Sequence, residues 1–203
     1  NTVGGSIPVQ AHYMLWIDNL LDLTHTTYVH ASTLGADGIC NAPIKTDRSD
    51  TAVRVTRWIL NDDPGPYWRG ALDKPGNCDR WQIMDFFLPS HTLLDVGVAP
   101  AGTGAPGGNR SSGVEARVCI SLTPIDEKSS CYHWAFARNF KRDKMVDRKT
   151  LESIGSAYME DKAVVEAQQR SLDSAPPDFR MIDLNADAGQ LAVRRLYEAA
   201  LAR

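Results

Sequence analysis

A chain of 203 residues is long enough to bury one substantial hydrophobic core, and we expect a single domain over residues 1–203. Hydrophobic residues make up 43% of the chain and charged residues 23%, which excludes a disordered or fibrous protein. A net charge of -3 gives no basic surface for nucleic acid, and no apolar run reaches the roughly 18 residues of a membrane span, so we expect neither partner.

The first predicted element is a helix from Val9 to about Val29, because apolar residues recur there at spacings of three and four. Gly35 and Gly38 follow it and predict its end. A strand is predicted over Thr51–Leu60, where valines alternate with polar residues and a Pro- and Gly-rich turn follows.

Further strands are predicted by alternation and by β-branched or aromatic content, over Asp79–Leu88, Thr92–Val98, Val114–Thr123 and Cys131–Asn139. The Gly- and Pro-rich residues 100–113 predict a surface loop between two of them. Because these strands follow one another without intervening helices, we expect an antiparallel sheet and the fold class α+β.

Helices are predicted to close the chain. The helix that begins after Lys144 has a predicted buried stripe of Leu151, Ile154, Tyr158, Val165 and Ala167. After two prolines, a last amphipathic helix is predicted over Ala186–Ala202, and its predicted inward side chains are Leu191, Leu196, Tyr197 and Leu201.

The cysteines argue against cysteine-ligated metal sites, because Cys40, Cys78, Cys119 and Cys131 form no Cys-x-x-Cys pair. We expect reduced thiols in a cytoplasmic protein.

Residues 18–30 place two aspartates and two histidines in an otherwise apolar helix. Asp22 and His25 are three apart and share a helical face, whereas His25 and His30 are separated by about 140° on an ideal helix. Both imidazoles can reach one ion only if the helix ends or unwinds near Tyr28. Two neutral imidazoles and one carboxylate form a facial triad, which leaves adjacent positions on iron(II) for dioxygen and substrate.

A lone histidine is more often a structural residue than a ligand, and His12, His91 and His133 are interpreted in this way, the last two being candidates for a pocket wall. The cluster around Asp22 differs, because a carboxylate buried beside leucines is costly unless it meets an imidazole or a metal-bound group. The residues alone leave the third ligand open among several acids of the long helix, Asp147, Glu152, Asp161 and Glu166.

The pattern Asp18-x3-Asp22-x2-His25-x4-His30 resembles the ligand motif of Rieske-type non-haem iron oxygenases. The sequence of residues 18–25, Asp-Asn-Leu-Leu-Asp-Leu-Thr-His, is similar to the subgroup that contains vanillate O-demethylase and dicamba demethylase. The resemblance continues in order along the chain through short segments at Val98–Pro100, Leu122–Pro124, Ser130–His133, Arg138–Phe140 and Glu160–Glu166.

This resemblance implies a mononuclear iron(II) held by His25, His30 and Asp161. It gives Asp22 the role of a carboxylate that hydrogen-bonds a ligand histidine and carries electrons from a neighbouring subunit, and it places Asn19 beside the iron. It also implies a helix-grip fold, in which a curved antiparallel sheet surrounds a long helix and further helices flank it.

The predicted sheet is rich in aromatic residues that could form an apolar pocket for an aromatic ring or could equally be plain core: Phe86, Phe87, Trp134 and Phe136. Leu94 and Ile120 align with positions at which dicamba demethylase presents polar groups to the substrate carboxylate. Both are candidate substrate contacts, and their apolar character argues against dicamba itself.

The function implied by the resemblance is that of the terminal oxygenase component of a multicomponent Rieske monooxygenase. It would insert one oxygen atom of O2 into an aromatic substrate, with O-demethylation of a methoxy-aromatic acid as the expected reaction. Electrons would come from NAD(P)H through a separate reductase or ferredoxin and a 2Fe-2S Rieske cluster, in a homotrimer.

The cluster itself needs a Cys-x-His pair and a Cys-x-x-His pair, and the sequence has only the formal match at Cys131–His133. We therefore expect a Rieske domain N-terminal to this chain in a longer polypeptide, and no turnover by the chain alone. The alternatives are hydroxylation or dihydroxylation of the ring of another aromatic acid, a metal-free carrier of hydrophobic ligands with the helix-grip fold, and a scaffold that only trimerises.

Overall fold

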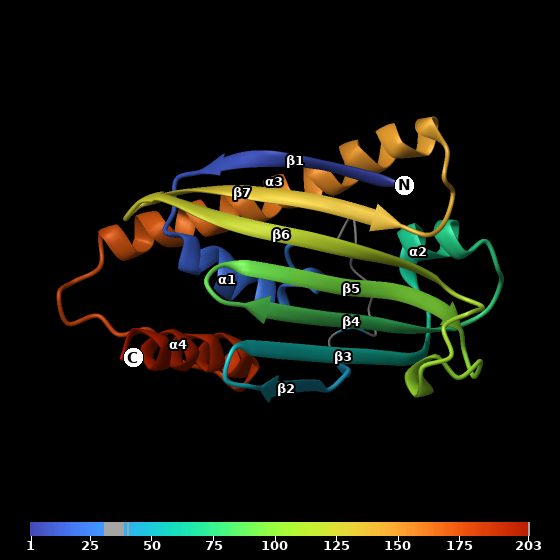
Figure 1. Cartoon of the computed structure of the whole chain (residues 1–203), viewed down its shortest axis with the longest axis horizontal. Coiled ribbons are helices and arrows are strands. Elements are labelled where there is room, and N and C mark those ends of the chain that lie inside the picture. The colour runs from blue at the N-terminus through green and yellow to red at the C-terminus, as the bar shows by residue number, and fades with distance from the viewer. Residues whose placement is uncertain (31–38, 40, 203) are drawn as a thin grey trace.

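A twisted antiparallel sheet forms one layer of the molecule, and helices cover one of its faces (Figure 1). This computed structural model describes residues 1–30, 39 and 41–202. Within them the sheet has seven strands in the order β1-β7-β6-β5-β4-β3-β2. Their bounds are β1 Thr2–Val9, β2 Ile44–Arg48, β3 Ala52–Asp62, β4 Cys78–Phe87, β5 His91–Pro100, β6 Val114–Asp126 and β7 Ser129–Arg138.

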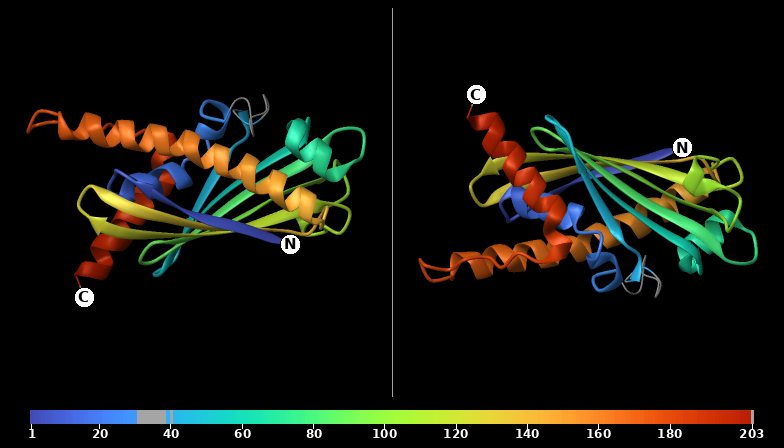
Figure 2. Two further views of the ribbon diagram at one scale, coloured as in Figure 1. Left: turned by 90° about the horizontal axis from the view of Figure 1, so that it is seen from above. Right: turned by 90° about the horizontal axis from the view of Figure 1, so that it is seen from below.

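The helices are α1 Tyr13–Leu21, α2 Gly65–Leu72, α3 Lys144–Asp173 and α4 Ala188–Leu201. The long helix α3 runs along the covered face, where it packs on β1 and α1, and α4 packs on β3 and α1 (Figure 2). This arrangement confirms the predicted class α+β and the helix-grip fold. In the described part of the chain, no helix combines the length and the apolar character that a membrane crossing needs.

The prediction of one helix from Val9 to Val29 is wrong at both ends. Residues up to Val9 form β1, which pairs with β7 along its whole length, and α1 ends at Leu21. A short 3-10 helix, His25–Thr27, follows. The apolar pattern continued past the true end of α1 because Leu23, which follows the helix, is buried in the same core as Leu20 and Leu21. Gly35 and Gly38 lie outside the described residues.

The strands predicted between residues 51 and 139 are confirmed. Alternation and the content of β-branched and aromatic residues are local signals, so they can be read from the sequence. The sequence analysis missed β1, β2 and α2. These elements are short or at the sheet edge: β2 pairs only with β3 among the described strands. Helix α2 begins at the end of the predicted turn and packs against β5.

The closing helices are confirmed, but part of each predicted buried stripe is wrong. In α3, Leu151 and Ala167 are exposed, and the buried residues are Thr150, Ile154, Ala157, Asp161, Val165 and Gln169. In α4, Leu201 is 86% exposed, and the buried residues are Gly189, Gln190, Val193 and Leu196. The spacing of apolar residues predicts that a segment is helical. Which face of the helix is buried depends on the elements that pack against it.

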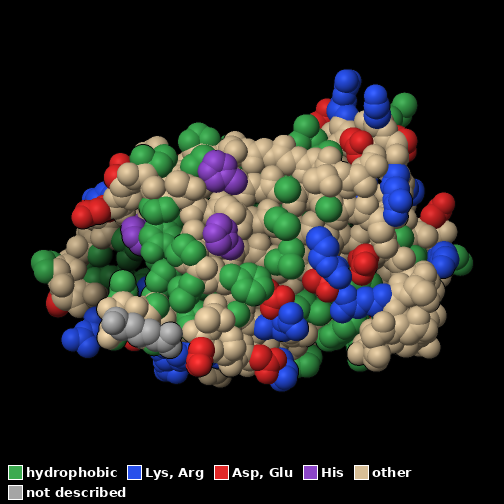
Figure 3. All heavy atoms as spheres, in the orientation of Figure 1, with side chains coloured by type: hydrophobic (Ala, Val, Ile, Leu, Met, Phe, Trp, Pro, Cys, Tyr) green, Lys and Arg blue, Asp and Glu red, His purple; other side chains and the backbone are tan. Residues whose placement is uncertain are grey.

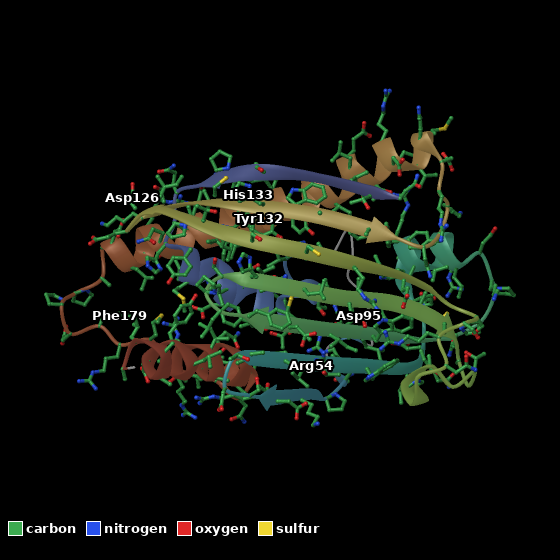
Figure 4. All side chains as sticks on the ribbon, viewed as in Figure 1. Arg54, Asp95, Asp126, Tyr132, His133 and Phe179 are labelled. Atoms are coloured by element: carbon green, nitrogen blue, oxygen red, sulfur yellow. The ribbon has the colours of Figure 1, made fainter. Side chains whose placement is uncertain are left out.

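The predicted loop between β5 and β6 folds back onto the outer face of the sheet. The guanidinium of Arg110 lies 4.5 Å from the ring centre of Trp81 and 5.5 Å from that of Trp58, and it pairs with Asp95 at 2.7 Å. Figure 4 labels Asp95 on this face. Of the cysteines, Cys78, Cys119 and Cys131 are free thiols, and Cys40 lies outside the described residues.

Candidate metal centre

Two histidines that follow α1 meet an aspartate of α3 from a distant part of the sequence. The Nε2 atoms of His25 and His30 are 3.3 Å apart, and Oδ1 of Asp161 lies 3.2 Å from Nε2 of His30 and 3.5 Å from Nε2 of His25. Among the described residues, this is the one group of three or more His, Cys, Asp or Glu side chains that could hold a metal ion.

The spacing of these atoms fits a first-row divalent cation. Bond lengths of about 2.0 to 2.2 Å place neighbouring ligand atoms roughly 3.0 Å apart in an octahedral site and roughly 3.5 Å apart in a tetrahedral one. Two imidazole nitrogens and one carboxylate oxygen at 3.2 to 3.5 Å therefore fit adjacent positions of one ion. Such a triad is typical of non-haem iron(II) and leaves the opposite face open.

The backbone after α1 orients His25. The carboxylate of Asp22 accepts hydrogen bonds from the backbone N–H of Thr24 at 2.8 Å and from the Thr24 hydroxyl, which turns the chain at the end of the helix. The backbone carbonyl oxygen of Asp22 lies 2.5 Å from Nδ1 of His25. A carbonyl oxygen only accepts, so Nδ1 donates and Nε2 keeps its lone pair for a metal.

This arrangement corrects the expected role of Asp22 in one respect. The contact with the ligand histidine is made by its backbone carbonyl group, whereas its carboxylate bonds to Thr24. Asn19, which the resemblance placed beside the iron, contacts the Asp161 carboxylate. Its Nδ2 atom donates a hydrogen bond to Oδ1 of Asp161 at 3.2 Å, and this bond holds the carboxylate toward the two histidines.

Glu160 contacts one of the two histidines, and the sequence analysis missed it. Its Oε2 atom lies 2.7 Å from Nδ1 of His30 and accepts a hydrogen bond from it, so Nε2 of His30 also faces Asp161 with its lone pair. Burial lowers the pKa of His30, but hydrogen bonds and charges from Asp161 and Glu160 outweigh it and raise this pKa above its usual value. The position of Glu160 directly before Asp161 was the available signal.

An apolar cavity adjoins the three side chains. Its lining includes His25, His30 and Asp161, together with apolar residues of the sheet and α3: Met84, Leu94, Val96, Val118, Ile120, Phe136, Ile154 and Ala157. Leu94 and Ile120, two of the candidate substrate contacts, thus face the same space as the triad. Phe136 also lines it, in agreement with the expected aromatic wall.

The other proposed wall residues do not fit this role. Phe86 packs against Tyr197 of α4 with ring centres 6.0 Å apart, Trp134 packs against Tyr158, and neither lines the cavity. Both are core residues, the alternative that the sequence left open. Phe87 is 42% exposed.

The remaining histidines lie away from the cavity. His133 and His91 bond to Ser6 and Ser121 on the outer face of the sheet, where Figure 3 shows histidine side chains at the surface and Figure 4 labels His133. Their prediction as pocket-wall residues is therefore wrong. The ring of His12 accepts a hydrogen bond from the backbone N–H of Met14 and begins α1, a structural role as predicted.

The comparisons with known proteins agree with the geometry of this site. The vanillate O-demethylase oxygenase C-terminal domain family matches residues 9–203. The chain is 40% identical over 193 residues to the putative toluene-4-sulfonate monooxygenase system iron-sulfur subunit of Comamonas testosteroni, covering 93% of this chain and 56% of that protein. It is 39% identical to the vanillate O-demethylase oxygenase subunit of Pseudomonas sp. (strain HR199 / DSM 7063), covering 98% and 58%.

Among solved structures, dicamba monooxygenase bound to 3,6-dichlorosalicylic acid superposes with a TM-score of 0.88 at 28% identity, covering all of this chain and 61% of that one. The chain thus spans less than two thirds of the length of these relatives. The family match and the shared fold lead to one conclusion: this chain belongs to the vanillate O-demethylase oxygenase C-terminal domain family and is a Rieske oxygenase catalytic domain.

Proposed function

We propose that this chain is the catalytic part of a terminal oxygenase component that removes the methyl group from a methoxy-aromatic acid. The observation that carries the proposal is the convergence of His25, His30 and Asp161 at the wall of an apolar cavity. The relatives support the same reaction class, because one is a vanillate O-demethylase oxygenase subunit and another is the oxygenase component of a dicamba O-demethylase.

In this proposal His25, His30 and Asp161 would hold one iron(II), and the bound metal would supply the chemistry of dioxygen activation. Asn19 keeps the Asp161 carboxylate turned toward the two imidazoles, and Glu160 fixes the ring of His30. These hydrogen bonds keep the donor atoms in place in the absence of substrate, so little reorganisation is needed when a ligand binds.

The apolar wall selects and positions the substrate. Leu94, Ile120 and Phe136 offer no hydrogen bonds, so an aromatic ring displaces water from the cavity and lies with its methoxy carbon toward the triad. One oxygen atom of O2 enters a methyl C–H bond and the other leaves as water, with two electrons and two protons consumed. The resulting hydroxymethyl ether then releases formaldehyde and leaves the phenol.

Electrons are proposed to enter on the side of Asp22. Its carboxylate is half-buried, and its backbone carbonyl group contacts His25, so it connects the protein surface to one proposed ligand. The 2Fe-2S Rieske cluster is proposed to lie in a domain N-terminal to this chain, in a neighbouring subunit of a homotrimer. A reductase or ferredoxin component would transfer electrons from NAD(P)H to this cluster. A relative named an iron-sulfur subunit, of which this chain covers 56%, supports that division.

The test uses the complete oxygenase with its reductase. We expect about one mononuclear iron per chain after anaerobic purification, and equal amounts of phenol and formaldehyde from 4-hydroxy-3-methoxybenzoate, one probe of the proposed class. His30→Ala should lose the mononuclear iron and turnover, while the matched variant His133→Ala, on the outer face of the sheet, should keep both.

Two results would overturn the proposal. A wild-type protein without mononuclear iron would favour a metal-free carrier of hydrophobic ligands. Conversion of methoxy-aromatic acids only to ring-hydroxylated products that keep the methyl group would exclude O-demethylation and favour ring oxygenation.

A further inference from the structure

One wall of the cavity is polar. Arg80, Gln82 and Tyr67 line the same space as the metal-binding triad and the apolar residues described above. Arg80 and Gln82 come from β4, whose inward-facing residues alternate with those on the outer face, and both side chains are at least nine-tenths buried. A charged and an amide side chain on the inner face of a core strand are unusual and need an explanation.

The charge in this wall is positive. Burial and the neighbouring guanidinium of Arg57 lower the pKa of Arg80 to about 10, so Arg80 still carries its proton at neutral pH. Among the residues that line the cavity, the one carboxylate is that of Asp161, which faces the two histidines. An anion in the cavity would therefore be attracted to the wall formed by Arg80.

The neighbours of Arg80 add hydrogen-bonding capacity. The hydroxyl of Tyr67 is buried and has no hydrogen-bond partner among the described residues, so an anionic acceptor would satisfy it. The side-chain amide of Gln82 can contribute an Nε2–H donor, whereas its Oε1 atom only accepts. Burial raises the pKa of Tyr67 to about 12, so its hydroxyl remains a donor at neutral pH. A buried polar atom without a partner lowers stability, and a bound ligand removes that cost.

We propose that Arg80, with Gln82 and Tyr67, binds the anionic group of an aromatic substrate, a carboxylate or a sulfonate. The inference rests on the proposed function, because it uses the same cavity, and it adds the residues that select the substrate class. It needs only that the guanidinium face the cavity, since five N–H donors can serve more than one acceptor.

Two further observations agree with this assignment. Leu94 and Ile120 present no polar atom to the cavity, so they cannot bind an anionic group through their side chains. The substrates named for two relatives, vanillate and toluene-4-sulfonate, are aromatic compounds that differ in whether the anion is a carboxylate or a sulfonate.

The test is equilibrium binding to the iron-loaded oxygenase, kept anaerobic and without reductant, by titration calorimetry. The probes are 3-methoxybenzoate, 3-methoxybenzenesulfonate and neutral methoxybenzene. We expect at least one acid to bind more tightly than the neutral probe. Arg80→Met should weaken binding of that acid by about 10- to 100-fold, because a hydrogen-bonded charge is lost, and should change the neutral probe by less than about 2-fold.

Arg54→Met is the matched control, because Arg54 belongs to β3, pairs with Asp85 on the outer face and is labelled there in Figure 4. It should leave the preference for acids unchanged. If Arg80→Met does not fold, Gln82→Leu gives the same test and should reduce binding of the acid more than binding of the neutral probe. The tighter-binding acid identifies the carboxylate or the sulfonate as the natural group.

The inference is overturned if wild type shows no preference for either acid, or if Arg80→Met and Gln82→Leu weaken acid and neutral probes equally. Because binding is measured without oxygen or electrons, this outcome is independent of turnover. Selective binding of acids without O-demethylation would refute the proposed reaction and leave the anion site intact.

Discussion

The carboxylate of Glu160 lies 2.7 Å from Nδ1 of His30, across 130 positions of sequence. The next residue of α3 supplies the carboxylate that faces Nε2 of the same ring. A single turn of the long helix thus orients one proposed ligand and contributes another. This relationship makes the position of α3, rather than the histidine motif alone, decisive for metal binding.

Replacing Glu160 by Gln should weaken metal binding without abolishing it. The amide oxygen can still accept from His30, but the negative charge that makes the imidazole a better ligand is lost, so we expect a decrease of about 10-fold or more in affinity. Competition of Co(II) with a chelator measures this change. Glu152→Gln, at an exposed position of α3, is the control and should match wild type. Equal affinities for the two variants would refute the role of Glu160.

The packing of α4 predicts opposite results for two leucines of one helix. Leu196 is 1% exposed, so Leu196→Ala should lower the free energy of unfolding by about 2 to 5 kcal/mol through lost burial and a residual cavity. Leu201 is 86% exposed, and Leu201→Ala should change the free energy of unfolding by less than about 0.5 kcal/mol. Urea denaturation followed by circular dichroism compares them. Similar losses for both would mean that α4 packs differently.

Two glycines should respond in opposite directions to alanine. A Cβ at Gly155 in α3 would contact nothing within 4 Å, so Gly155→Ala should stabilise the protein by roughly 1 kcal/mol through helix propensity. A Cβ at Gly97 in β5 would lie 2.5 Å from the carbonyl oxygen of Val114 and against the ring of Trp81. Gly97→Ala should therefore destabilise by about 1 to 3 kcal/mol. Thermal unfolding of both variants tests this, and a stabilised Gly97→Ala would contradict it.

Asp18 should make stability depend on pH between about 4 and 6. Burial raises its pKa from 3.8 to about 6, although an ion pair with Arg194 opposes the shift. The folded state thus holds this proton more tightly than the unfolded state, so the stabilisation is complete below pH 3.8 and is lost as pH rises through 6. The loss is at most about 3 kcal/mol.

The measurement for Asp18 is the free energy of unfolding of wild type minus that of Asp18→Asn, from urea denaturation at several pH values. Subtraction removes the titration of the other carboxylates. We expect this difference to fall between pH 4 and 6 and to be flat above pH 7. Parallel curves for the two proteins would show that Asp18 has its ordinary pKa in the folded state.

Much of the sheet and the two proposed histidine ligands could be predicted from the sequence. The strands from β3 to β7 were predictable because most of them alternate between apolar and polar side chains and because β-branched and aromatic residues are frequent in them. The pattern of Asp22, His25 and His30 was specific enough to indicate a metal site, and the resemblance added Asp161. The end of α1 at Leu21 was not predictable, because Leu23 beyond it is buried in the same core.

The tertiary structure decided the rest. The sequence alone determined that two histidines lie close together near the start of the chain. It also determined that α3 carries several acids, each of which is an equally plausible third ligand. Only the packing of α3 against α1 brings Asp161, which the resemblance implied, and Glu160, which the sequence analysis missed, to the two histidines. Only the pairing of β4 turns Arg80 and Gln82 into the cavity. The period of a helix or strand can be read from residues that are neighbours in the sequence. Contacts between groups 130 positions apart, such as His30 and Glu160, depend instead on how helices and strands pack to bury their apolar faces.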